Sequence, residues 1–104
     1  MNRVTCVSYD FIKTHPLFDK EAERVYKMYP HPLIKIFTIE ERRKSVALCV
    51  AYDGEDKIIL FHFNSKRDNL VVPFINYFKQ KAKKEVYLYE STDSSKEMWH
   101  RCLL

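Results

Sequence analysis

Three apolar, strand-like runs follow one another in the middle of the chain, and only two short charged turns separate them. Leu33–Glu40 alternates and is rich in β-branched residues. Ser45–Tyr52 is apolar almost throughout, which is typical of a strand buried on both faces. An Asp-Gly pair in the second turn favours a hairpin with Lys57–Phe63. Connections this short join antiparallel neighbours, so the sequence predicts a three-stranded meander at the centre of the fold.

Helical patterns lie on both sides of this meander. Before it, apolar side chains recur at helical spacing from Leu17 to Tyr29, with acidic residues in the early turns. The Pro-His-Pro segment at 30–32 ends this helix, because proline cannot donate the next backbone hydrogen bond. After the meander, one apolar stripe runs from Leu70 to Ala82, and Pro73 fits the first turn of a helix. The sequence thus predicts one helix on each side.

The outer segments complete a single domain. Arg3–Tyr9 and Glu85–Glu90 alternate, so we expect a strand in each. Ser94 and Glu97 have the spacing of a capping box, which predicts a final helix through Cys102. The predicted order is β-α-β-β-β-α-β-α, one α+β domain over residues 1–104 with a mixed, mostly antiparallel sheet.

Composition and charge limit which partners and which cellular compartment we expect for this domain. The 104 residues carry a formal net charge of +4, a mild bias towards anionic partners. No apolar stretch approaches the ~20 residues of a membrane helix, and the first residues lack a signal-peptide segment. The three cysteines are widely spaced without a C-x-x-C motif. We expect a soluble, cytoplasmic protein that has no membrane contact and no metal.

The closing segment Thr92–Leu104 has the length of a pattern that reads roughly N-x-x-A-x-x-L-Y-x-x-x-G-F. The matched positions are Thr92 at the Asn, Ser95 at the Ala, Met98 at the Leu, Trp99 at the Tyr and Leu103-Leu104 at the Gly-Phe. This pattern is similar to the last helix of the GNAT-type N-acetyltransferase superfamily, whose element order the whole chain also resembles. The resemblance implies a GNAT-like fold.

In that family the loop after the hairpin strand binds the pyrophosphate of acetyl-CoA and reads approximately [QR]-x-x-G-x-[GA]. Here the segment 67–72 keeps only the initial arginine, and the chain has a single glycine, Gly54. The resemblance implies that a coenzyme would contact a short run of the loop: Lys66, Arg67, Asp68, Asn69 and Leu70. Loss of the loop glycines brings bulky side chains to a backbone that phosphate would have to approach.

Catalytic candidates follow from the same resemblance. His62 or Glu40 would act as the general base, and His100 would act as the acid in place of the family tyrosine. The tyrosine position holds Trp99, whose indole N–H cannot transfer a proton at neutral pH. Strand alternation places His62 on the same sheet face as Ile58 and Leu60.

These departures favour a GNAT-like domain that has lost acetyl transfer and acts as a protein-binding or structural component, similar to small phage proteins of reduced GNAT type. The family continues into two further strands after the position of Leu104, which implies an open sheet edge for a protein partner or a second copy. The alternative is an acyl-CoA-dependent N-acetyltransferase that binds acetyl-CoA.

A second alternative is a basic adaptor that binds nucleic acid. Lysines crowd the end of the second predicted helix, and tyrosines that could stack on bases follow nearby. The residues concerned are Lys79, Lys81, Lys83, Lys84, Tyr77, Tyr87 and Tyr89.

Overall fold

A computed structural model of the chain describes residues 3–28, 32–66, 70–91 and 97–101, with side chains up to residue 88. Within these ranges, six strands form one sheet in the order of the sequence. They are β1 (Arg3–Val7), β2 (Ile34–Glu41), β3 (Lys44–Asp53), β4 (Lys57–Ser65), β5 (Glu85–Ser91) and β6 (Glu97–Arg101).

The predicted meander forms the centre of this sheet. Strands β1, β2, β3 and β4 pair antiparallel, and so do β5 and β6. Between them, β4 and β5 run parallel, pairing only Lys57–Leu60 with Glu85–Leu88. The chain is therefore an α+β domain with a mixed, mostly antiparallel sheet, as the alternation and the short turns predict.

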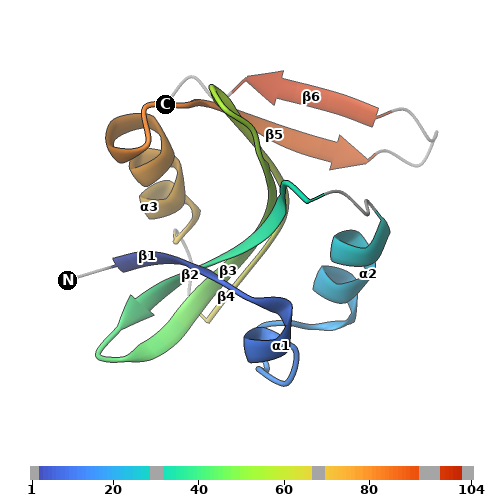
Figure 1. Ribbon diagram of the computed structural model, residues 1–104, viewed down its shortest axis with the longest axis vertical. Coiled ribbons are helices and arrows are strands. Elements are labelled where there is room, and N and C mark those ends of the chain that lie inside the picture. Colours follow the sequence, from blue (N-terminus) through green and yellow to red (C-terminus); the bar gives the residue numbers. More distant parts are fainter. Residues whose placement is uncertain (1–2, 29–31, 67–69, 92–96, 102–104) are drawn as a thin grey trace.

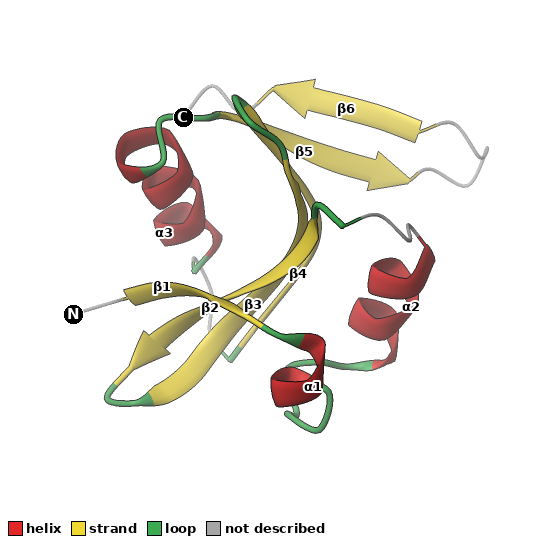
Figure 2. Cartoon of the chain, in the orientation of Figure 1, coloured by secondary structure: helices red, strands yellow, loops and turns green. Residues whose placement is uncertain are grey.

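Helices cover both faces of the curved sheet (Figures 1 and 2). On one face lie α1 (Tyr9–Ile12) and α2 (Lys20–Met28), and on the other lies α3 (Val71–Asn76), which continues as the π-helical turn η1 (Tyr77–Lys81). Each layer encloses its own core. The α3 core includes Phe37, Cys49, Leu60, Phe74 and Phe78, and the α1–α2 core includes Ile12, Phe18, Val25, Ile36 and Leu48.

The N-terminal strand ends two residues earlier than its alternation predicts. The hydroxyl of Ser8 accepts a hydrogen bond from the Phe11 N–H at 3.2 Å and so caps α1. Tyr9 consequently belongs to a short helix that the sequence reading missed. A serine followed by helix-compatible residues was the available signal.

The final helix predicted from Ser94 and Glu97 is wrong over the described residues 97–101. This segment is β6, which pairs with Tyr87–Ser91 along the outer edge of β5. Ser94 and Cys102 lie outside the described residues. The capping-box pattern reports only a local preference, and pairing with an available sheet edge overrides it. Among the described strands, the free sheet edges are those of β1 and β6.

In the two central hairpins, the tight two-residue turn forms at an Arg-Arg pair and not at the Asp-Gly pair that the sequence favours. The β2–β3 turn has two central residues, Arg42 and Arg43, with φ of 52° and 67°. Positive φ at both positions defines a type I′ turn, which normally takes Asn-Gly. The Asp-Gly turn instead has three residues, 54–56, and Gly54 has a negative φ. Both hairpins form, but neither depends on a glycine with positive φ.

Candidate functional site

A β-bulge in β4 decides which side chains face α2. Val50 of β3 opposes His62, whereas Ala51 opposes Leu60, so Phe61 is an extra residue in β4. Leu60 packs in the core under α3, and the bulge then turns His62 to the opposite face. The expectation that His62 shares a face with Ile58 and Leu60 is wrong, because the extra residue inverts the alternation.

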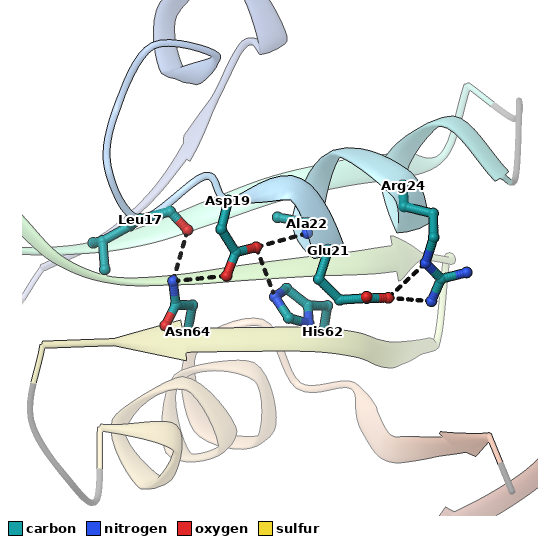
Figure 3. A network of polar contacts seen from close by, with 7 residues as sticks. All are labelled: Leu17, Asp19, Glu21, Ala22, Arg24, His62 and Asn64. Carbon is teal, nitrogen blue, oxygen red and sulfur yellow. Dashed lines mark hydrogen bonds and ion pairs between the residues drawn. The ribbon is translucent and has the colours of Figure 1, made fainter. Parts of the chain in front are cut away.

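Asp19 is the N-cap residue immediately before α2, and its side chain reaches β4 of the sheet. Its carbonyl accepts the Glu23 N–H at 3.0 Å, and its carboxylate Oδ1 accepts the Ala22 N–H at 2.9 Å, which is N-cap geometry. The same oxygen lies 3.4 Å from Nε2 of His62 (Figure 3). One carboxylate therefore both caps a helix and contacts the histidine.

Asn64 contacts the second carboxylate oxygen of Asp19 and the backbone just before it. Its Nδ2 donates to the Leu17 carbonyl at 2.9 Å and to Asp19 Oδ2 at 3.4 Å (Figure 3). Further along α2, Arg24 Nε donates to Glu21 at 2.6 Å on the exposed surface. Asp19, His62 and Asn64 form what we call the β4 clamp, which ties the start of α2 to the last part of β4. Sequence reasoning missed Asp19, although an aspartate before a helical stripe is an N-cap signal.

The chemistry open to His62 is limited by this setting. Its side chain is 18% exposed, and Nε2 is buried without a hydrogen bond among the described groups. A carboxylate beside an imidazole can orient the ring. The nitrogen that faces Asp19 is, however, turned into the protein rather than towards solvent.

The structure does not bring Glu40 to this histidine. Glu40 pairs with Arg3 and Ser45 near the β2–β3 turn. The β2 residue in the row of His62 is Ile36, four positions away, a separation of roughly 13 Å along the strand. Two candidate bases are thus separate groups at different levels of the sheet.

His100 and Trp99 lie on β6, where they pair with Leu88 and Tyr89. Strand β5 separates them from β4. The transfer of the family's helical tyrosine position to Trp99 is wrong in its structural setting, because that position is in a strand. The side chains of both residues lie outside the described part.

Strand β4 extends two residues beyond its predicted end at Phe63, up to the proposed coenzyme loop. Asn64 and Ser65 belong to β4, and the N–H of exposed Lys66 donates to the Val46 carbonyl at 2.9 Å. Leu70, 4% exposed, packs in the core under α3. The remaining candidates, Arg67, Asp68 and Asn69, lie outside the described residues.

A second polar cluster joins three parts of the chain. Asp53, at the end of β3, accepts a hydrogen bond from Lys35 Nζ of β2 at 3.1 Å and another from Lys84, which precedes β5. Burial alone would raise the pKa of Asp53, but the bonds from Lys84 and Lys35 outweigh it and lower the pKa overall. Sequence reasoning assigned Lys84 to a basic surface.

Several members of that expected basic surface make contacts within the fold. Lys84 is only 18% exposed and is held by Asp53, and Tyr77 packs edge-on against Phe78. The Tyr87 hydroxyl donates to Glu85 at 2.8 Å. The side chain of Tyr89 lies outside the described part. Lys84, Tyr77 and Tyr87 therefore each have a contact within the fold.

Within the described ranges, no group of three or more His, Cys, Asp or Glu residues is placed to hold a metal ion. No described helix has the length and apolar character needed to cross a membrane. Comparison with protein-family models finds no match, and comparisons with curated proteins and with solved structures find none either.

Proposed function

We propose that the chain is a GNAT-like domain that has lost acetyl transfer and works by binding another protein chain. The observation that carries this proposal is the β4 clamp. Its histidine, the best placed candidate for proton transfer, directs a buried nitrogen at the carboxylate that caps α2. Glu40 lies two strands away and roughly 13 Å further along the strand direction, so it offers no second group beside His62.

The strand pattern supports the GNAT-like part of the proposal. The parallel pairing of β4 and β5 stops after Leu60 and Leu88, and the bulge at Phe61 follows at once. Beyond this point β4 continues to Ser65 beside β3 alone, while β5 continues to Ser91 beside β6. Two parallel strands joined by a helix fit the element order that the resemblance implies, and here these strands separate halfway.

Edge strand β1 is the surface that we assign to the partner. Its sequence Arg-Val-Thr-Cys-Val has one charge, at Arg3, and no proline, lysine or described bulge that would discourage strand addition. Strand β6 is the other edge, and it carries Glu97 and Arg101 at its two ends. A partner strand, or β1 of a second copy, would extend the sheet by backbone hydrogen bonds.

Calorimetry with acetyl-CoA and with CoA tests the loss of acetyl transfer. We expect no binding in the micromolar range. Micromolar binding that disappears in Arg67→Ala would overturn this part of the proposal.

Sedimentation velocity of the wild type and of Cys6→Glu tests self-association through the β1 edge. The exposed Cys6 position lies on β1, and a new charge there opposes strand addition.

The second candidate is an acyl-CoA-dependent transferase with His62 as the base. The contact between Asp19 and His62 supports it, because a carboxylate can fix the orientation of a neighbouring imidazole for proton transfer. Acetyl-CoA hydrolysis or transfer to an amine acceptor that is lost in His62→Gln, with the fold retained, would favour this candidate over the first.

A further inference from the structure

One end of the sheet collects most of the excess positive charge of the protein. Five exposed cations occupy the strand ends and the hairpin turn there: Arg3, Arg42, Arg43, Lys44 and Lys66. We call this group the basic rim. The same end of the sheet also carries two carboxylates, Glu40 and Glu41, both half-buried. The rim therefore has a surplus of three positive charges, against a formal net charge of +4 for the whole chain.

Strand pairing places these cations in a row. Arg3 on β1 is the partner of Glu40 on β2, and Lys44 begins β3 opposite Glu41. Lys66 follows β4, and its N–H bonds to Val46 of β3. Adjacent strands lie about 4.8 Å apart, so the row crosses four neighbouring strands over roughly 14 Å.

The two turn residues of the basic rim, Arg42 and Arg43, have an unfavourable backbone conformation. Both Arg42 and Arg43 have positive φ, although type I′ turns favour Asn-Gly at these positions. The hairpin thus sets two guanidinium groups side by side in sequence where a neutral pair would form the same turn with less strain. Outliers of this kind concentrate at functional positions.

We propose that the basic rim binds the sugar–phosphate backbone of nucleic acid. Guanidinium groups bind phosphate oxygens in a bidentate manner, and a row of cations matches a regularly charged strand. A protein partner that packed its side chains against the rim, rather than adding a strand to β1 by backbone hydrogen bonds, would instead need apolar or aromatic anchors. Of the described residues, the large exposed hydrophobics are Phe11, Met28 and Val72, and none of them belongs to β1, β2, β3 or β4. The proposal is independent of the partner assigned to the β1 edge.

Fluorescence anisotropy with a labelled 20-base-pair DNA duplex of mixed sequence tests the rim. We expect the logarithm of the binding constant to fall with the logarithm of salt concentration with a slope of about −4.5 if the five cations contact phosphates. The variant Arg42→Asn/Arg43→Gly, which suits the turn, should weaken binding at 50 mM salt about tenfold or more. Its slope should be flatter by about 2.

Matched variants separate the rim from total charge. Arg42→Lys/Arg43→Lys keeps both charges and should stay within about threefold of the wild type. Lys57→Gln/Lys81→Gln removes two exposed charges at the far end of β4 and in η1, and should also stay within about threefold. Lys44→Gln/Lys66→Gln leaves the turn residues unchanged and should weaken binding like the arginine variant.

Three results would overturn the proposal. The first is no binding by the wild type at 50 mM salt, and the second is an equal loss in Lys57→Gln/Lys81→Gln. The third is tighter binding, at the same salt concentration, of a labelled ten-residue polyglutamate peptide than of the duplex. That result would assign the rim to an acidic protein segment.

Discussion

Gly54 is the single glycine of the chain, and its role is to let two backbone segments approach. A Cβ at this position would lie 2.9 Å from the Lys57 carbonyl oxygen and 3.0 Å from Cε1 of Tyr52. Lys57 O also accepts the Gly54 N–H at 2.9 Å, so it cannot move away without loss of that bond. We expect Gly54→Ala to lower the free energy of unfolding by about 1–3 kcal/mol in urea denaturation. Exposed Glu55→Ala is the control, with a change within about 0.5 kcal/mol; equal midpoints for both variants would contradict the prediction.

Arg42 and Arg43 present the opposite case, in which side chains occupy a turn that favours glycine. A non-glycine residue in the left-handed region costs roughly 1 kcal/mol or more. Replacement by Asn-Gly should therefore raise the free energy of unfolding by about 1–2 kcal/mol, measured in urea. Arg42→Lys/Arg43→Lys retains the strain and should change stability little. A less stable Asn-Gly variant would show that the arginines make stabilising contacts that offset the strain.

At the scale of elements, the β4 clamp joins α2 to the sheet. Asp19→Ala removes the N-cap of α2 and the contacts to His62 and Asn64, and should cost about 1–2 kcal/mol in thermal unfolding. Asp19→Ser restores a capping hydroxyl but is too short to reach β4. It should recover most of the loss if capping dominates. A double-mutant cycle of Asp19→Ala with Asn64→Ala should show a coupling of about 0.5 kcal/mol or more; strict additivity would contradict the clamp.

Sequence patterns predict the meander and both main helices because local periodicity and burial agree there. Ser45–Tyr52 and the stripe that contains Phe74 and Phe78 are examples. The sequence predictions fail where pairing with a neighbouring strand determines the local structure. Pairing along β5 turns Glu97–Arg101 into a strand, and the extra residue Phe61 moves His62 to the α2 face. Neither event leaves a local signal, so the candidate site could be predicted only as a set of residues.

At the scale of the whole molecule, Asp53 joins the ends of the antiparallel and parallel parts of the sheet. Lys35 reaches it from β2, and Lys84 reaches it from the segment that leads from η1 into β5. The carboxylate is 15% exposed and Lys84 is 18% exposed, so removal of one partner leaves the other poorly solvated. We therefore expect Asp53, rather than an exposed ion pair such as Lys13–Asp10, to control acid stability.

Asp53→Asn should lower the free energy of unfolding by about 1–3 kcal/mol at pH 7, because two hydrogen bonds to a charged group are weakened. The contacts from Lys84 and Lys35 make the pKa of Asp53 lower in the folded state than in the unfolded chain. Its contribution is therefore fully present above the unfolded pKa, about 3.9, and is lost as the pH falls through the folded pKa. Urea denaturation at pH 7, 4 and 2.5 should show the wild type and Asp53→Asn converging at the lowest pH. Exposed Glu55→Gln is the control, with a small difference at pH 7. A gap between wild type and Asp53→Asn that stays constant down to pH 2.5 would mean that Asp53 stabilises the fold by packing and not by charge.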